Sequence, residues 1–236
     1  MLRMRMSWLI GSRSGFTILV GLVMLFVGSG CGHQEQVQTL SANWAGYCAY
    51  GGAFRNVTAT WVQPSVRPSW RKTEASFWVG LDGHHSDTVE QIGTEDRTDG
   101  HFAEYAAWYE MWPRPQQRIP MTVNPGDAMT GTVTSDGRGE FTLKLTDNST
   151  GASFATTRRS PAGRCASAEI CAEAPLRAPW RLARFGLVRF SRCAVNGQSL
   201  VSFNWQRTDV VAPDKAWRLA TSPLGPDREI FEVVRR

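Results

Sequence analysis

The residues with the clearest chemical potential are an amide and an acid: Gln91 in V-E-Q-I-G-T and Glu173 at the end of S-A-E-I-C-A-E. A carboxylate can take a proton from water and return it to a leaving group, while an amide N–H can stabilise an oxyanion. Such a pair can hydrolyse an amide bond without a covalent intermediate. The pair is useful only if the fold brings these two distant positions to one cleft.

Two tryptophan-rich segments indicate where a cleft could lie. In Y-A-A-W-Y-E-M-W, strand alternation puts Trp108, Glu110 and Trp112 on one face, so that two indoles flank an acid. In W-V-G-L-D, the same alternation puts Trp78 and Asp82 on one face. Tryptophan combines a large apolar surface with one N–H donor, which suits a binding cleft as well as a packed core. Alternation alone leaves both interpretations open.

The rest of the sequence predicts strands almost throughout, because β-branched and aromatic residues lie between turn-forming clusters and show little 3.6-residue period. Strands are predicted at residues 57–62, 75–81, 105–112, 129–134, 141–145, 187–190 and 230–234. Strong turn signals lie between them at 124–127, 136–137, 147–148 and 196–197. Many short strands with frequent turns indicate an all-β fold, an antiparallel two-sheet sandwich.

One segment conflicts with this pattern. Residues 166–174 are rich in good helix formers, and their propensity alone predicts a helix. Helix and strand geometry both place Glu169 and Glu173 on the same face of the element. In a strand, Cys171 would share that face as well. The same-face prediction therefore holds for either conformation.

The first thirty residues are typical of an export signal. Arg3, Arg5 and Arg13 precede an apolar run at residues 16–27, which small residues follow. This run of about 12 residues is shorter than the roughly 20 that a membrane-spanning helix needs. We predict a signal peptide at residues 1–30, a short linker at 31–40 and one domain at 41–236, in an exported protein.

The end of the signal has two interpretations. Ser29-Gly30-Cys31 resembles a bacterial lipobox, in which Cys31 would carry the lipid and attach the protein to a membrane. Gly28, however, stands where a lipobox usually has a branched aliphatic residue, and an ordinary signal peptidase needs only small residues before the cut. The protein is expected to be either secreted or lipid-anchored at the cell envelope.

Charge and composition exclude one class of partner. Without the signal, 23 basic residues face 21 acidic ones, a net charge of +2. The basic residues are scattered and form no stripe with interleaved aromatic residues, so a nucleic-acid surface is not indicated. No internal repeat or Pro-rich linker divides the remaining chain, which favours a single domain.

Four cysteines remain after Cys31: Cys48, Cys165, Cys171 and Cys193. In an exported protein they can oxidise, and we predict one or two structural disulfides, with Cys171 the candidate for a free thiol in the site. Their spacing matches no zinc motif. A metal site is therefore not predicted.

Six motifs resemble, in their order, those of the glutamic endopeptidases, or eqolisins. They are W-V-G-L-D-G (78–83), E-Q-I-G-T (90–94), Y-A-A-W-Y-E-M-W-P (105–113), P-G-D (125–127), A-E-I-C-A-E (168–173) and F-G-L-V-R-F (185–190). The segments S-A-N-W-A-G-Y (41–47) and 222–234 extend the resemblance over essentially the whole chain after the signal.

The resemblance implies a lectin-like sandwich whose concave face binds a polypeptide substrate. It places the family's catalytic Gln on Gln91 and its catalytic Glu on Glu173, with no cofactor. Residues that line or support the family's site match Trp78, Asp82, Glu110 and Glu169 in this sequence, and the tryptophan alternation adds Trp108. An acid endopeptidase acting as a monomer is the resulting expectation.

Two positions depart from the family pattern. Ala106 stands where fungal members have Asp, and Cys171 replaces an aliphatic residue between the two glutamates. Both catalytic groups remain, but the pH dependence and the sensitivity to thiol reagents could change. Because a free Glu has a pKa of about 4.3, we predict best activity in acid, fading toward neutrality.

Other functions fit part of the sequence. A glycoside hydrolase could use Glu110 and Glu173 as its two carboxylates, and a Trp-lined groove could belong to a carbohydrate-binding sandwich without catalysis. Neither gives Gln91 a role. A serine hydrolase fits least, because G-x-S-x-G is absent and the four histidines lie in polar segments that are predicted to be loops.

Overall fold

The computed structural model describes residues 36–236 except 101, 177–178 and 213–216. The predicted signal peptide and Cys31 therefore lie outside the described residues. Among the described residues, no helix is long and apolar enough to span a membrane.

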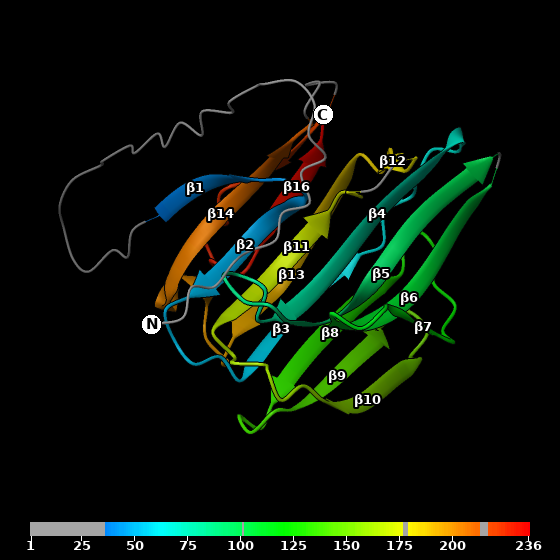
Figure 1. Cartoon of the computed structure of the whole chain (residues 1–236). Helices are drawn as coiled ribbons and strands as arrows, with labels where there is room; N and C mark the ends of the chain where they lie inside the picture. Colours follow the sequence, from blue (N-terminus) through cyan, green and yellow to red (C-terminus); the bar gives the residue numbers. More distant parts are fainter. Residues whose placement is uncertain (1–35, 101, 177–178, 213–216) are drawn as a thin grey trace, which may run out of the picture.

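Strands make up nearly all of the regular structure (Figure 1). In chain order the elements are β1 (Gln36–Ser41), β2 (Trp44–Tyr50), β3 (Asn56–Val62), β4 (Ser69–Leu81), β5 (Val89–Gly100), β6 (Ala103–Trp112), β7 (Gln117–Ile119), β8 (Ala128–Ser135), β9 (Glu140–Asp147), β10 (Ser153–Arg159), β11 (Ser167–Glu173), β12 (Arg181–Leu182), β13 (Leu187–Val195), the 3-10 turn η1 (Leu200–Ser202), β14 (Asn204–Val211), β15 (Arg218–Thr221) and β16 (Phe231–Arg235).

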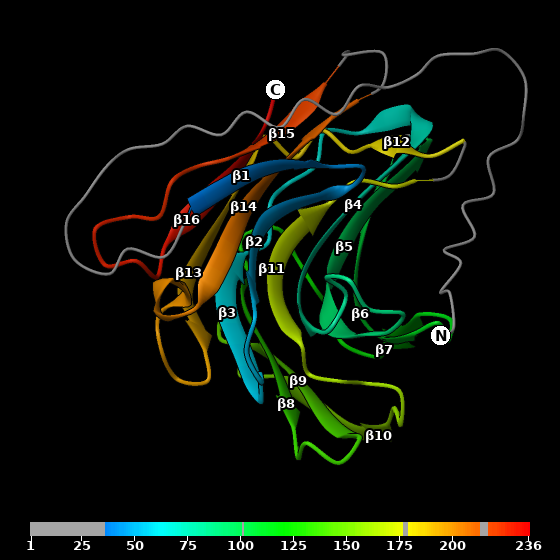
Figure 2. The same ribbon diagram turned by 60° about the vertical axis from the view of Figure 1, so that its left-hand side comes forward.

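The strands form two layers that one hydrogen-bonded path connects. One layer has the order β10-β9-β8-β3-β13-β16, and the other has the order β15-β14-β2-β11-β4-β5-β6-β7, with β16 paired to β15 between them. All pairs along this path are antiparallel, while β1 joins β14 and β12 joins β4 in parallel. Figure 2 shows how strongly the second layer is bent. The predicted antiparallel two-sheet sandwich is confirmed.

The apolar core fills the space between the layers. Strand alternation sends Phe77, Val79 and Leu81 of β4 into this core, where β4 contacts β3 and β8 of the other layer. Trp61 of β3 is fully buried there and donates a hydrogen bond from its Nε1 to Thr94 Oγ1 (2.9 Å). The opposite, concave face of the second layer is thereby left for polar residues.

Most strand predictions are confirmed, and β11 resolves the conflict over residues 166–174. This segment is a strand whose Ala168, Ile170 and Ala172 point into the core. Packing between the layers therefore overrides the helix propensity of its residues. Residues 36–41, most of which we assigned to a linker, form β1 and pair with β14.

The predicted disulfides are wrong for the described cysteines. Cys48, Cys165, Cys171 and Cys193 are all buried free thiols. Cys193 lies in the apolar core, the Cys165 thiol donates to Ser135 Oγ (3.2 Å), and the Cys48 thiol donates to Glu169 Oε1 (3.6 Å). These three thiols thus lie in different surroundings, and the spacing of the cysteines in the sequence could not reveal this.

Two acids of β5 are buried on the core side of the sheet. Glu90 and Asp96 are both 0% exposed, and their carboxyl oxygens have no hydrogen-bond partner that meets bonding geometry among the described residues. Burial raises the pKa of Glu90 to about 8 and raises the pKa of Asp96 well above its ordinary value. Both acids are therefore protonated in acid, and the fold tolerates them best there.

Replacement of Glu90 by Gln tests this pH dependence of stability. In the unfolded chain Glu90 ionises near its ordinary pKa of 4.5, whereas in the folded chain it does so near 8. Neutral Glu90 therefore costs no stability below pH 4.5, its pKa in the unfolded chain. As the pH rises from there toward 8, its pKa in the folded chain, the free energy of unfolding decreases. Glu90→Gln should leave the free energy of unfolding unchanged at about pH 4 and raise it by roughly 4 kcal/mol at about pH 8. Denaturant titrations of both proteins measure this, with the exposed Glu140→Gln as control; equal stabilities at pH 8 would contradict it.

Candidate active site

The register of four strands builds the candidate site on the concave face. Gln91 of β5 lies directly opposite Gly80 of β4 on one side and Glu110 of β6 on the other. Glu173 of β11 lies opposite Ser76 of β4. Because directly opposed residues and every second residue share a face, Gln91, Glu110 and Glu173 all face the concave side. The structure thus brings the two predicted catalytic residues to the same sheet face, with only β4 between their strands.

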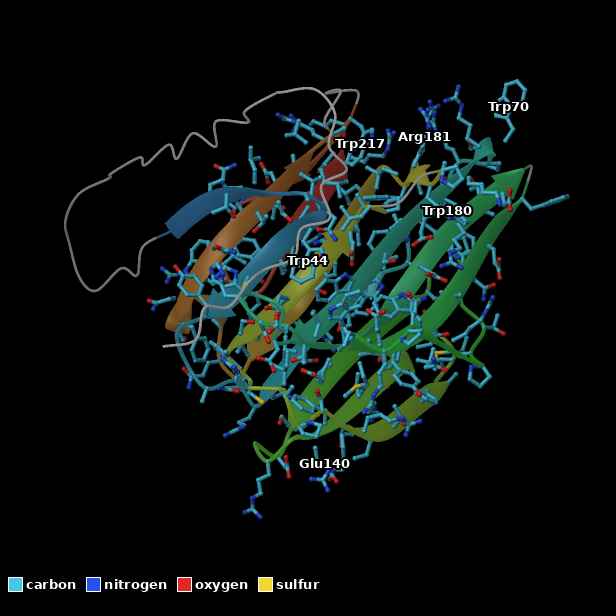
Figure 3. The ribbon with its side chains drawn as sticks, viewed as in Figure 1. Trp44, Trp70, Glu140, Trp180, Arg181 and Trp217 are labelled. Carbon is cyan, nitrogen blue, oxygen red and sulfur yellow. The ribbon has the colours of Figure 1, made fainter. Side chains whose placement is uncertain are left out.

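Glu173 has two hydrogen-bond donors at its carboxylate. Asn43 Nδ2 donates to Oε1 (2.6 Å), and Trp78 Nε1 donates to Oε2 (2.9 Å). The Trp44 and Trp78 rings meet edge to face, with centroids 5.0 Å apart. Figure 3 shows Trp44 over β2 at the front of the molecule. Glu173 is consequently fixed between two indoles and keeps partial exposure to solvent.

Burial sets the protonation behaviour of Glu173. It raises the pKa of this acid to about 7, whereas the nearby side chains of Trp44, Asn43 and Trp78 lower it and the charge of Glu110 raises it further. Partial solvent access tempers the effect of burial. Glu173 therefore exchanges its proton in a range that suits a residue serving as both base and acid.

Gln91 is held by an acid on the neighbouring strand. Its Nε2 donates to Glu110 Oε2 (2.6 Å), while its Oε1 is buried without a partner among the described residues. Burial raises the pKa of Glu110, and the hydrogen bonds from Gln91 and from the main chain of Gln116 lower it. A primary amide has two N–H groups. Glu110 occupies one of them and leaves the second for another acceptor.

Two glycines give the site its shape. A Cβ at Gly93 would lie 2.6 Å from Trp78 Cβ and 2.3 Å from the main-chain oxygen of Phe77, and a Cβ at Gly80 would lie 3.0 Å from Cζ3 of Trp78. A side chain at Gly93 would therefore clash with the main chain and with Trp78, and one at Gly80 would press against the Trp78 indole. The absence of both side chains lets Trp78 lie along the sheet between the positions of Gln91 and Glu173.

The other predicted apolar residues form the floor of this face. Trp78, Trp108, Val89 and Cys171 form a buried cluster separate from the core, and Trp44 packs against it. Trp108 is 2% exposed, and its Nε1 has no partner among the described residues. Cys171 lies opposite Trp78, and burial raises the pKa of its thiol well above the ordinary value. The thiol at this position is thus uncharged.

Asp82 and Glu169 lie deeper than the sequence indicates. Asp82 is 0% exposed and accepts main-chain N–H groups of Arg164, Cys165 and Ala166 at 2.8 to 2.9 Å. It therefore anchors the segment that leads into β11. Glu169 is also 0% exposed, and burial raises its pKa well above the ordinary value. Both residues support the site from below.

Three residues not predicted from the sequence also contribute to the site: Asn43, Glu95 and Gln116. Asn43 binds Glu173, although S-A-N-W-A-G-Y was recognised only as a motif. Glu95 lies opposite Ala106, where the family's fungal members have Asp, and its Oε2 accepts from Arg97 (3.0 Å) and from Gln116 Nε2 (3.1 Å). Gln116 thereby contacts both Glu95 and Glu110. Strand alternation in β5 places Glu95 on the same face as Gln91, so the sequence could have indicated Glu95. Nothing in the sequence indicates the contacts of Gln116.

A metal would find no obvious ligands in this arrangement. Among residues 36–236 outside the gaps, no group of three or more His, Cys, Asp or Glu side chains is placed to hold one. The groups present can move protons and donate hydrogen bonds to a developing charge.

The sequence profile of the peptidase A4 family matches residues 42–221, which include every residue of the site. The chain belongs to the peptidase A4 family. These are the glutamic endopeptidases, or eqolisins, and the protein is accordingly a glutamic-type peptidase, which hydrolyses peptide bonds. No curated protein is similar enough to count as a match.

Solved eqolisin structures share the fold. Scytalido-glutamic peptidase with a transition state analog inhibitor has a TM-score of 0.69 and 24% identity over 84% of this chain and 100% of that chain. SCP-B, an eqolisin in complex with the tripeptide Ala-Ile-His, has a TM-score of 0.68 at the same identity and coverage. Aspergilloglutamic peptidase from Aspergillus niger has a TM-score of 0.53 and 22% identity over 70% of this chain and 99% of that chain.

Trp78→Phe tests the hydrogen bond that this eqolisin makes to Glu173. Phenylalanine keeps most of the ring but removes the Nε1 donor, so the charged form of Glu173 loses a bond of about 1.5–3 kcal/mol. The pKa of Glu173 should rise by about one unit or more. A carboxyl NMR titration, with Glu173→Gln to assign the signal, measures the change. Trp70→Phe, at an 87% exposed position, is the control; an unchanged pKa in Trp78→Phe would contradict the bond.

Proposed function

We propose that this peptidase cleaves its substrate with Glu173 as general base and acid and Gln91 as oxyanion stabiliser. The observation that carries the proposal is the position of both residues on the concave face, on strands separated only by β4. In a flat sheet their positions would be offset by about 13 Å along the strands and about 10 Å across them. Side chains on the concave face of a bent layer converge, and this layer is strongly bent (Figure 2).

The reaction follows from the donors and acceptors. The Glu173 carboxylate takes a proton from water, the resulting hydroxide attacks the scissile carbonyl, and protonated Glu173 then gives its proton to the departing amine. Gln91 cannot titrate. Its free N–H donates to the carbonyl oxygen as that oxygen gains charge, a contribution of about 3 to 4 kcal/mol for one such donor.

Glu110 orients the amide in this mechanism. Its bond to Gln91 Nε2 fixes which end of the side chain carries the donors, because Glu110 as an acceptor selects the NH₂ group. Gln116 in turn steadies Glu110 through its main-chain N–H. Glu110 is therefore a positioning residue that acts through Gln91.

Unpartnered polar atoms on the concave face support the binding of an extended peptide. Gln91 Oε1 and Trp108 Nε1 are buried without partners among the described residues. Buried polar groups normally have partners, and exceptions call for an explanation. Main-chain groups of a substrate would satisfy them.

We also propose that the protein is exported and works in the range up to neutrality. Export rests on the signal-like residues 1–30, and Cys31 is the residue that would carry a lipid anchor. The upper limit of this range rests on the buried carboxyls, which destabilise the fold as the pH rises. Because Glu173 must be ionised to act as the base and its pKa is raised to about 7, the expected optimum moves up from the range near 4 to about pH 7, where the loss of stability begins to limit it.

Glu173→Gln and Gln91→Ala test the dyad directly. With a denatured protein as substrate, Glu173→Gln should lose nearly all turnover because the only proton carrier is gone. Gln91→Ala should lower kcat by about 10²- to 10³-fold, as expected for the loss of one oxyanion donor. Release of peptides at about pH 7, near the pKa of Glu173, is the measurement, and pepstatin should not inhibit because no aspartate dyad is proposed.

Glu140→Gln is the matched control, because Glu140 lies on β9 of the other layer and far from Trp44 in Figure 3. Its activity should equal that of the wild type. Undiminished turnover in Glu173→Gln or Gln91→Ala would refute the dyad. Release of reducing sugar from a polysaccharide, or retention on it without turnover, would instead support the glycosidase or the carbohydrate-binding alternative.

The pH profile of kcat/KM provides a further prediction. It should be bell-shaped, with an acid limb that follows ionisation of Glu173, so that activity rises with pH up to the pKa of that residue. Trp78→Phe should move this limb to higher pH, since it removes a donor to the carboxylate. Rates measured from pH 3 to 9 decide the matter, and a flat profile over that range would exclude Glu173 as the base.

A further inference from the structure

An open cavity with two adjacent histidines lies at one end of the concave face. It has a volume of about 420 Å³ and is lined by Tyr50, Gly51, Gly52, His84, His85 and Ala166. The two imidazoles belong to the short connection between β4 and β5, and the phenol ends β2. The proposed dyad uses none of these residues.

The cavity continues the face that carries Gln91. The main-chain N–H of His84 donates to Glu169 Oε1 (3.3 Å), and Glu169 lies opposite Gly80, which lies opposite Gln91. On the other side, Gln206 of β14 is two strands beyond Glu169 in the same row, with Cys48 of β2 between them, and contacts His84 Nδ1 through its Nε2 (3.2 Å). A substrate that lies across β11 from Gln91 would therefore meet the two histidines.

The connection holds the histidines in a constrained geometry. Asp82 and His85 both have positive φ angles, 62° and 57°, which are uncommon for residues other than glycine. The rings of His84 and His85 lie 4.0 Å apart, and the Tyr50 ring lies 5.3 Å from that of His84. Backbone conformations of this kind are kept where the surroundings fix them, often at binding sites.

The chemistry of the lining favours an anionic group. Two imidazoles and one phenol line the cavity, whereas no Asp or Glu is among its lining residues. If the Gln206 amide donates to His84 Nδ1, His84 Nε2 carries the proton and donates it as a neutral imidazole. A hydrogen bond whose acceptor is an ionised carboxylate is charge-assisted and stronger than a neutral one.

We infer that this cavity is a subsite for a carboxylate of the substrate, either an Asp or Glu side chain or the C-terminal carboxylate of a peptide. The inference rests on the proposed function, since it places the cleaved peptide across the same face. It makes His84 and His85 determinants of specificity, not of the chemical step.

The groups that face His84 are compatible with an anion. Burial, followed by the charge of His85, lowers the pKa of His84 to about 4. Burial raises the pKa of Glu169 and that of Cys48, so both are uncharged in acid and do not repel a carboxylate. The titratable and polar side chains around His84 come from four places. They are Tyr50 and Cys48 on β2, Glu169 on β11, the uncharged Gln206 on β14, and Asp82 and His85 on the same connection. Asp82 is fully buried, and three main-chain N–H groups bind its carboxylate.

The test uses peptides in which a single Glu moves along an otherwise neutral sequence, each paired with the same peptide carrying Gln. Binding to the full-length Glu173→Gln variant at about pH 5 is measured by calorimetry, so that no turnover is needed. One position should bind the Glu peptide about tenfold more tightly than its Gln partner, as expected for a charge-assisted bond. Peptides with a free or an amidated C-terminus separate the terminal carboxylate from a side chain.

Adding His84→Gln and His85→Gln to this variant should abolish the preference while leaving the affinity for the Gln peptide unchanged. Lys144→Gln, which removes an exposed cation of β9, should keep the preference. If no Glu position and no free C-terminus is preferred, or if the preference survives the double substitution, the subsite is refuted. Peptide cleavage by the wild type is measured in parallel. If the wild type does not cleave but the preference for Glu remains, the dyad is refuted and the subsite is not.

Discussion

The antiparallel register of β11, β4, β5 and β6 is the constraint on which the rest of the site depends. A shift of one residue in any of these pairs would turn its polar set into the core and its apolar set toward solvent. The core residues Phe77, Val79 and Leu81 make such a shift costly, because they fill the space between the layers. The same alternation that buries them presents Trp78 and the acids on the other face. The arrangement of the candidate site is thus set by the same alternation that packs the core.

The electrostatics of this face differ from those of ion-paired sites. Glu110, Glu169 and Glu173 have raised pKa values because burial outweighs the hydrogen bonds that they receive. Among the described residues, none of these three forms a salt bridge. In acid such groups are neutral and cost little to bury. The buried Glu90 on the core side likewise favours the acid side, whereas Glu173 must ionise to act as the base, so stability and the proposed chemistry limit activity from opposite sides of neutrality.

Sequence reasoning was strong where local alternation decides the structure and weak where distant segments meet. The strands, the major turns and the common face of Glu169 and Glu173 follow from short-range patterns. The strand conformation of β11 did not, because layer packing overrides propensity there. Free thiols in place of disulfides, and the contacts of Asn43 and Gln116, depend on long-range placement that spacing does not encode. Family resemblance supplied the pairing of Gln91 with Glu173.

The bond between Gln91 and Glu110 weighs against a glycosidase on this face. Two catalytic carboxyls in such an enzyme must each be free to reach the sugar ring or a water molecule. Glu110 instead accepts a hydrogen bond of 2.6 Å from Gln91 and another from the main chain of Gln116, and both interactions lower its pKa and fix its direction. With Glu110 engaged in this way, one proton carrier and one oriented amide remain. That combination suits the hydrolysis of an amide bond, in which one group moves protons and the other stabilises an oxyanion.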